Sequence, residues 1–171
     1  ANKDAGYSTP LPWRMQDQQW LLLGSGQSYL AVDLKSGQEQ WRIRWLTEYG
    51  VNAADPVVDG DRVFISSGYG KGAALLKPGA GAEPEVVWKS KVLRTQRNGA
   101  VLLNGFLYGV DGDSSEKAVL KCVELANGKE RWSEPSVGSG ALMVADSKLI
   151  VLGDHGELMV APASSEGFHP T

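Results

Sequence analysis

The residues best suited to holding a metal ion lie in one short polar segment, Asp111-Gly-Asp-Ser-Ser-Glu116. Asp111, Asp113 and Ser115 alternate along it, and alternating oxygen side chains could wrap around a hard cation such as Ca²⁺. The segment lacks the central glycine and the distal glutamate of an EF-hand loop. Because Asp-Gly-Asp is also common in plain hairpin loops, Asp111 and Asp113 are weak candidates and we expect no metal site.

Other polar features have plainer structural explanations. Gly68-Tyr-Gly-Lys-Gly72 superficially resembles a phosphate-binding loop, but such a loop precedes a helix, whereas residues 73–76 predict another strand. Lys71 and Arg94 could contact anionic groups, although solvated charge is the simpler interpretation. His155 lies in a Gly-Asp-His-Gly turn, and a chain with 2 histidines is a poor source of zinc ligands.

Composition sets the class of protein. The 171 residues are 42% hydrophobic and 22% charged, as expected for a single globular domain. The 17 basic and 20 acidic residues give a net charge of −3 without a block of like charge, so we expect no nucleic-acid partner. The apolar runs are far shorter than the roughly 20 residues of a membrane-spanning helix, so no transmembrane segment is expected. Cys122, the single cysteine, is expected to be a small buried residue rather than a nucleophile.

The polar segments described above lie between the apolar runs of a sequence repeat, which must position them. Residues 31–41 and 122–132 are variants of one pattern: a short apolar and acidic alternation, a small polar residue and a glycine, then three residues and a tryptophan. Each period contains an apolar run, a turn rich in Asp, Asn, Gly or Gln, a stronger apolar run and two further short segments. The stronger runs recur about every 43 residues, beginning at Trp20, Val63, Leu107 and Leu149.

Four short strands repeated every 40 to 50 residues are the signature of a β-propeller blade. Helical solenoids have similar periods, but no window keeps apolar residues at helical spacing, and 21 Gly and 8 Pro interrupt the chain. We therefore predict an all-β fold, a β-propeller of four-stranded antiparallel blades forming one domain over residues 1–171. The blades are expected at approximately 8–46, 52–91, 97–134 and 138–168, and the last lacks its outer strand because the chain ends before a fourth tryptophan.

The tryptophan pattern predicts contacts between blades. Ala31 and Asp33 share one face of a strand, and Gly37 takes the backbone conformation of a tight turn. The Trp41 ring can then lie against a neighbouring blade, over small residues such as Ala31, with its N–H free to find a carbonyl. In the second period residues 77–84 are expected to be a loop insertion. The same blade-docking role is expected of Trp88, Glu124, Gly128 and Trp132.

The pattern Ala-x-Asp-x-x-(Thr/Ser)-Gly-x-x-x-Trp, matched over residues 31–41, resembles the tryptophan-docking motif of the pyrroloquinoline-quinone (PQQ)-like β-propeller repeats. That family includes quinoprotein dehydrogenases and BamB-type outer-membrane assembly propellers. The second copy departs from the motif at Cys122, Glu124 and Asn127, and the stretch 50–72 looks especially BamB-like. The resemblance implies an exported, periplasmic bacterial protein. It also implies full propellers of seven or eight blades, of which four are about half.

Three functions are compatible with this resemblance. The first is a non-catalytic module that binds a protein or peptide partner, or the remaining blades of a larger propeller, as an assembly scaffold. The second is part of a PQQ-dependent alcohol or sugar oxidoreductase, which would need calcium, a carboxylate base and an aromatic platform. Trp13, Trp20 and Trp45 are the tryptophans that remain for such stacking.

The third is a structural half-propeller. It could close on itself, with residues 7–9 as the missing strand, or pair with a second copy as a homo-oligomer. We predict the first function, with no catalytic residue and no bound cofactor.

Overall fold

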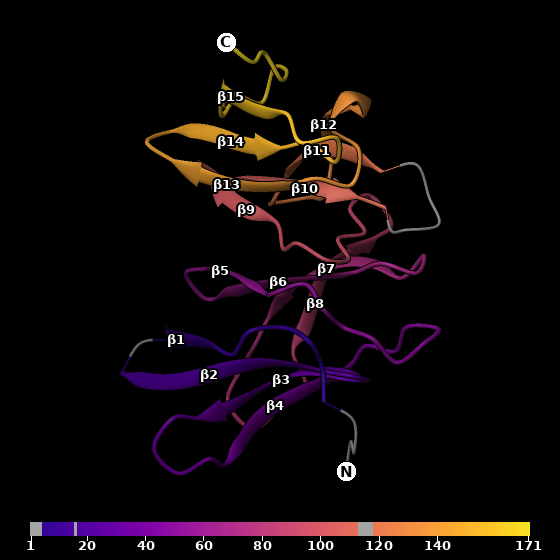
Figure 1. Cartoon of the computed structure of the whole chain (residues 1–171). Helices are drawn as coiled ribbons and strands as arrows, with labels where there is room; N and C mark the ends of the chain where they lie inside the picture. Colours follow the sequence, from indigo (N-terminus) through magenta and orange to yellow (C-terminus); the bar gives the residue numbers. More distant parts are fainter. Residues whose placement is uncertain (1–4, 16, 113–117) are drawn as a thin grey trace.

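The computed structural model describes residues 5–15, 17–112 and 118–171, which form four antiparallel sheets joined by loops (Figure 1). We name the sheets blades 1 to 4 in chain order, and in each of them the strands keep their sequence order from one edge to the other. Blade 1 contains β1 (Leu11–Met15), β2 (Gln18–Ser25), β3 (Ser28–Asp33) and β4 (Glu39–Arg44). Blade 2 contains β5 (Val57–Asp59), β6 (Arg62–Ser67), β7 (Gly72–Lys77) and β8 (Glu85–Ser90). Blade 3 contains β9 (Val101–Leu103), β10 (Phe106–Asp111), β11 (Val119–Glu124) and β12 (Glu130–Glu134), and blade 4 contains β13 (Ala141–Ala145), β14 (Lys148–Leu152) and β15 (Leu158–Pro162).

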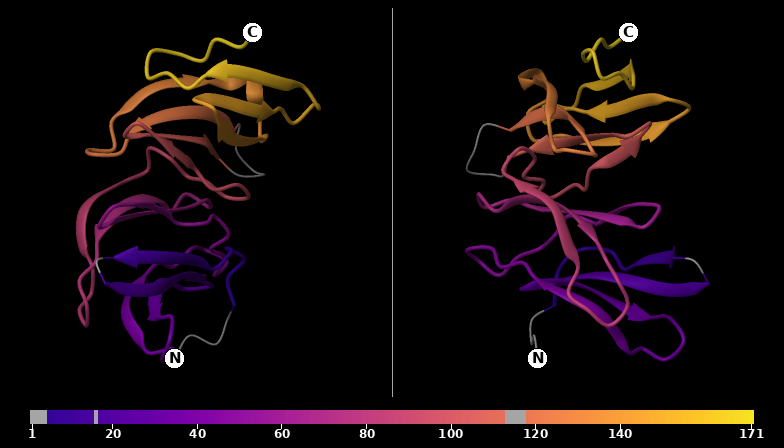
Figure 2. Two further views of the ribbon diagram at one scale, coloured as in Figure 1. Left: turned by 90° about the vertical axis from the view of Figure 1, so that its left-hand side faces the viewer. Right: turned by 180° about the vertical axis from the view of Figure 1, so that it is seen from behind.

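The blades stack face to face along an arc, and blades 1 and 4 lie at its two ends (Figures 1 and 2). The predicted all-β propeller of four-stranded blades is confirmed, as is the missing outer strand of the last blade. One 3₁₀ turn, η1 (Pro135–Val137), joins blade 3 to blade 4. Among the described residues, no helix has the length and apolar character needed to cross a membrane.

Residues 7–9 do not supply the missing strand of blade 4. The backbone N–H of Tyr7 donates to the carbonyl of Asn52 at 3.0 Å, and the backbone N–H of Gly24 donates to Ser8 Oγ at 2.9 Å. These contacts hold the segment along blade 1, at the other end of the arc from blade 4 (Figure 1). The structure therefore corrects the expectation that this segment closes the ring.

Tight turns within the blades use residues that tolerate a positive φ. Asn104 and Gly105 have φ values of 51° and 81°, and Asp146 and Ser147 have values of 46° and 57°. Two successive residues in this region make the turn that matches the twist of antiparallel strands. The turns join β9 to β10 and β13 to β14, where the sequence predicts hairpins.

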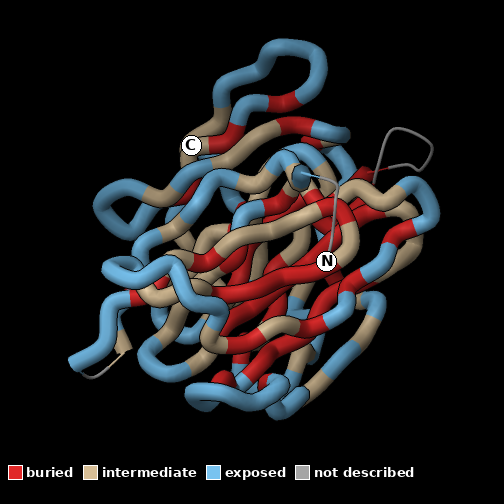
Figure 3. Tube along the Cα trace, turned by 90° about the horizontal axis from the view of Figure 1, so that it is seen from below, coloured by how far each residue is buried: buried red, intermediate tan, exposed pale blue. Residues whose placement is uncertain are grey.

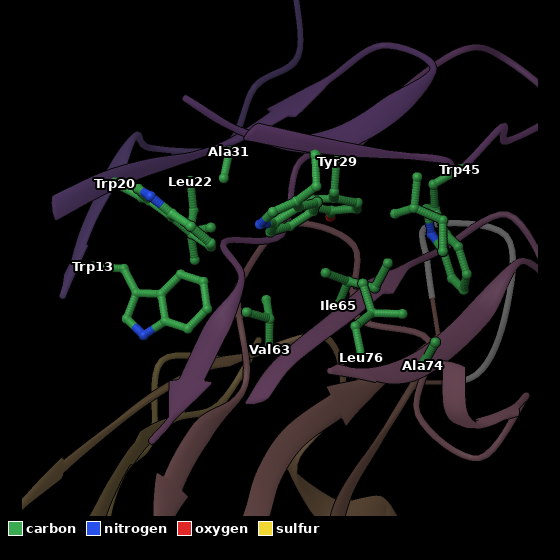
Figure 4. Packing of buried hydrophobic residues seen from close by; sticks show 12 residues of the cluster. Trp13, Trp20, Leu22, Tyr29, Ala31, Trp45, Val63, Ile65, Ala74 and Leu76 are labelled. Carbon is green, nitrogen blue, oxygen red and sulfur yellow. The ribbon is translucent and has the colours of Figure 1, made fainter. Parts of the chain in front are cut away.

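Apolar side chains fill the spaces between successive blades. Because side chains alternate across a strand, blade 2 contributes Ile65 to the cluster shared with blade 1 and Phe64 to the cluster shared with blade 3. Figure 4 shows the first cluster, with Trp13 at one end and Trp45 at the other. Seen from below, buried residues run through the middle of the strands and exposed residues gather at the loops (Figure 3). The cluster between blades 3 and 4 is built around Leu120, Cys122, Leu149 and Val151.

Candidate functional site

Trp88 and Trp132 reach from the outer strand of one blade to the next blade. Trp88 Nε1 donates to the carbonyl of Leu125 in blade 3 at 2.8 Å, and Trp132 Nε1 donates to the carbonyl of Ser164 at 2.8 Å, just beyond β15. Both acceptors occupy the same place in the repeat. A Cβ atom added to Gly128 would lie 3.0 to 3.1 Å from the Trp88 ring, so the ring rests against this turn. These are the contacts that blade docking requires.

The remaining motif residues shape the turn after the third strand in blades 1 and 3. Asp33 Oδ1 accepts hydrogen bonds from Ser36 Oγ at 2.7 Å and from the backbone N–H groups of Ser36 and Lys35 at 2.7 and 3.1 Å. These donors, the Ser36 hydroxyl foremost, lower the pKa of Asp33. At the equivalent turn of blade 3, the carbonyl of Glu124 accepts from the N–H of Gly128 at 2.9 Å. Gly37 has a φ of 70° and open space beside it, because blade 1 has no described blade before it.

Trp41 differs from its two counterparts. Its side chain packs in the cluster between blades 1 and 2 and is 3% exposed, opposite Ala31 in the strand register. Its Nε1 is buried without a hydrogen-bond partner, although the sequence pattern predicts a carbonyl acceptor. In blade 2 a longer loop, residues 78–84, stands where blade 3 has a short turn. This loop contacts blade 1 through its backbone, because the N–H of Gly81 donates to the carbonyl of Gln40 at 2.9 Å. An open hollow of about 340 Å³ lies between this loop and residues 39–42.

Replacing Trp88 or Trp132 with phenylalanine should lower the free energy of unfolding by about 1 kcal/mol more than the same change at Trp41. At the first two positions the change leaves a carbonyl without its donor, whereas at Trp41 it removes an N–H that has no acceptor. Urea denaturation of the three variants measures the difference. Trp41 is the most buried of the three, so loss of packing alone would give the opposite order and contradict the prediction.

Asp111, one of the two weak metal candidates, is buried in a charge network. Its side chain is 2% exposed. Arg94 Nε donates to Oδ1 at 2.9 Å and the Arg94 backbone N–H donates to the same oxygen at 2.6 Å, while Lys121 Nζ lies 3.0 Å from Oδ2. Burial would raise the pKa of Asp111, but the hydrogen bonds from Arg94 and Lys121 outweigh it and lower the pKa. Asp113 lies outside the described residues, and within the described part of the chain no group of three His, Cys, Asp or Glu side chains could hold a metal ion.

The other candidate site residues lie either in the core or in an exposed turn. Cys122 is buried, and burial raises the pKa of its thiol to about 11, so it stays protonated at neutral pH. His155 is exposed in its turn and lies 3.7 Å from Asp154. The three tryptophans that a cofactor platform would use, Trp13, Trp20 and Trp45, are all buried in the first cluster.

Asn52, which sequence reasoning missed, links three segments in the interior. Its side chain is fully buried, and its Nδ2 donates to the carbonyls of Ser25 at 2.9 Å and Trp45 at 2.8 Å. Ser67 Oγ of blade 2 donates to Asn52 Oδ1 at 2.7 Å and accepts from Trp45 Nε1 at 3.2 Å. The loop that follows β4 is thus fixed to both neighbouring blades. No periodic signal in the sequence marks this residue.

Lys71 lies in a group of cations around one indole ring. Lys71 Nζ is 4.8 Å and Lys89 Nζ is 5.0 Å from the centroid of the Trp45 ring. Burial, and then the positive charges of Lys89 and Arg44, lower the pKa of Lys71. The glycine-rich loop that carries Lys71 leads into the strand β7 and not into a helix.

The far face of blade 4 is apolar and open. In each of its strands the side chains alternate between a row that packs on blade 3 and a row that points away from it. The outward row includes Leu158, which is 70% exposed, and the exposed residues Met143 and Leu152. Cross-strand pairing places Leu152 beside Leu158 and Met143 beside Ile150. Large apolar side chains therefore form one continuous surface across the three strands.

Comparisons with known proteins agree with this geometry. The model of a family described as outer membrane protein assembly factor BamB matches residues 4–134. BamB from Moraxella catarrhalis has a similar fold, with a TM-score of 0.64 and 14% sequence identity over 96% of this chain and 50% of that chain. The computationally designed protein Ika4 gives a TM-score of 0.64 and 11% identity over 96% of this chain and 94% of that chain. For the designed protein Ika8 the values are 0.57 and 8%, over 96% of this chain and 47% of that chain.

These structural likenesses show the fold alone, because the identities are low. The chain spans about half the length of the BamB and Ika8 chains. No curated protein matches it. Since the family model matches most of the sequence, the chain belongs to the BamB-type family of PQQ-like β-propeller proteins.

Proposed function

We propose that this chain is a protein-binding propeller module that acts as an assembly scaffold and docks a further propeller blade on the open face of blade 4. The observation that carries the proposal is the apolar surface on that face. Exposed apolar patches of this kind mark sites of protein interaction. The description of the family as an assembly factor supports a scaffold role, and the same family membership supports an exported, periplasmic protein.

A propeller blade fits this face better than a small ligand does. Every interface between successive blades is made by two sheets packed through one row of apolar side chains each. The outward row of blade 4 is mostly apolar as well, with Ala141, Met143 and Ala145 in β13, Ile150 and Leu152 in β14, and Leu158, Val160 and Pro162 in β15, while the charged Lys148 lies in the same row at the start of β14.

Blade 1 offers a surface of matching kind. Leu21, Leu23 and Val32 point away from blade 2 and are half-buried. Two copies of the chain could therefore pack blade 4 against blade 1 twice. A contact between two different faces closes into a ring when the rotation allows it. A further set of blades from a longer polypeptide would cover the same two faces.

The chain taken alone should self-associate through this face. Replacing both Leu152 and Leu158 with glutamate should abolish the association, because it would bury charge without a partner at the centre of the interface. Light scattering over a range of protein concentrations measures the mass. Val86→Glu is the control, because Val86 is exposed on the outer strand of blade 2. A monomeric wild-type chain, or a double variant that associates as the wild type does, would contradict the proposal.

A further inference from the structure

Two lysines lie over one ring at the boundary between blades 1 and 2, and the charge of Arg44 acts on one of them, Lys71. Arg44 ends β4, Lys71 lies in the loop before β7, and Lys89 lies near the end of β8, the outermost strand of its sheet. Lys71 Nζ and Lys89 Nζ lie 4.8 and 5.0 Å from the centroid of the Trp45 ring. Figure 4 shows that ring at one end of the cluster between the two blades.

No ion pair between described residues involves this group. The ion pairs between described residues include Arg42 with Glu39, Lys77 with Asp61 and Arg94 with Asp111, but none involves Arg44, Lys71 or Lys89. Burial and repulsion by the other two cations lower the pKa of Lys71. In a chain of net charge −3, this is a local excess of positive charge held at an energetic cost.

The indole beneath the cations is fixed. Trp45 is buried, and its Nε1 donates to Ser67 Oγ at 3.2 Å. A cation over an indole face is attracted by the electrons of the ring but keeps its full charge. The two lysines are therefore positioned in advance, with no carboxylate of the described residues in an ion pair with either of them.

A pair of aromatic rings lies on the same two loops. Tyr49, which is 67% exposed, contacts Tyr69 edge to face with a centroid distance of 4.8 Å. Tyr49 follows Trp45 in the loop after β4, and Tyr69 precedes Lys71 in the loop before β7. Tyrosine, tryptophan and arginine are the residues enriched where proteins contact one another. The two ammonium groups, together with the exposed Tyr49 and the half-buried Tyr69, suit a segment that carries carboxylates spaced along the chain and an apolar side chain.

We propose that the surface made by Arg44, Tyr49, Tyr69, Lys71 and Lys89, above the buried ring of Trp45, binds an acidic segment of a partner protein. This inference rests on the proposed function of the chain as a protein-binding module and names the chemistry of the partner. Carboxylates of the segment face Lys71 and Lys89, and an apolar side chain contacts Tyr49. Binding weakens as salt is added, because exposed charges are screened.

The test uses a hexaglutamate peptide and the ¹⁵N-labelled chain. Titration with the peptide should shift the assigned indole N–H resonance of Trp45 until it saturates. In the K71Q/K89Q variant the affinity should fall at least about tenfold. The control is K35Q/K129Q, which removes the same charge from two exposed turns and should change the affinity by less than about twofold. Matching thermal unfolding midpoints show that each variant is folded.

Three results would overturn the inference. The first is equal affinity in both double variants, and the second is the absence of a saturable shift in the wild type. The third is tighter binding of inorganic phosphate or of phosphatidylglycerol vesicles than of the peptide, which would assign the surface to a phosphate group. Light scattering of K71Q/K89Q separates this inference from the proposed function, because association through blade 4 should be unchanged. A failure of peptide binding would leave that association intact.

Discussion

Asp111→Asn should lower the free energy of unfolding by about 3 kcal/mol or more at neutral pH. The substitution keeps the shape of the side chain but removes the charge that balances Arg94 and Lys121 in the interior of blade 3. Lys121 keeps its ion pair with Glu130 at 3.0 Å, but the donors of Arg94 and Lys121 that face Asp111 lose a charged acceptor at a buried position. Breaking a buried pair in this way costs more than the pair itself contributes. Urea denaturation at neutral pH measures the loss.

Asp61→Asn is the matched control for this substitution. Asp61 lies 3.6 Å from Lys77 with both side chains more than half exposed, and an exposed pair of this kind contributes less than about 1 kcal/mol. If the two substitutions cost the same, the Asp111 network does not stabilise the fold.

Asp111→Asn should also change how the stability of the chain responds to acid. The pKa of Asp111 is lower in the folded chain than its ordinary value of 3.8, so its charge contributes stability above that value. This contribution is lost as the pH falls from 3.8 through the lower folded pKa. The difference in stability between the wild type and Asp111→Asn should therefore shrink in this acidic range, as urea titrations at several pH values would show.

Asn52→Ala should cost about 3 kcal/mol or more of unfolding free energy. The substitution leaves the carbonyls of Ser25 and Trp45 without the donor they have in Asn52, and it leaves the Ser67 hydroxyl without its acceptor. Asn52 is fully buried. Each buried polar group left without a partner costs about 1 to 3 kcal/mol. The midpoint of chemical denaturation should fall accordingly.

Asn98→Ala provides the comparison for Asn52. Asn98 is half-buried, and its Nδ2 donates one hydrogen bond, to the carbonyl of Gly140 at 3.1 Å. Its replacement should cost about 1 kcal/mol. Equal losses at the two positions would mean that Asn52 does not hold the loop after β4 between its neighbours.

Sequence reasoning predicted the parts of this molecule that repeat. The blades follow from the period of the apolar runs, and the short last blade follows from the end of the pattern after Ala161. The hydrogen bonds of Trp88 and Trp132 have a local signal, because the tryptophan, the glycine and the turn lie at fixed spacing. The blade-docking role of these residues stays a prediction that the phenylalanine variants test.

Contacts between segments far apart in the sequence could not be predicted in this way. The partners of Asp111 come from a connecting loop and from β11, so the sequence showed a possible calcium ligand and not a buried ion pair. The cations over Trp45, which follows the last strand of blade 1, come from blade 2. The missing acceptor of Trp41 depends on an insertion in the next blade. In each case the motif was visible, but its surroundings depended on how the blades pack.

The open face of blade 4 bears on how such chains grow during evolution. Apart from Lys148, its outward row is apolar, as are the rows already buried between blades. A duplicated blade added after this face would find an apolar surface ready to receive it. A chain can therefore gain a whole repeat without evolving a new kind of interface. A chain that loses a whole repeat exposes an apolar surface that another repeat can cover.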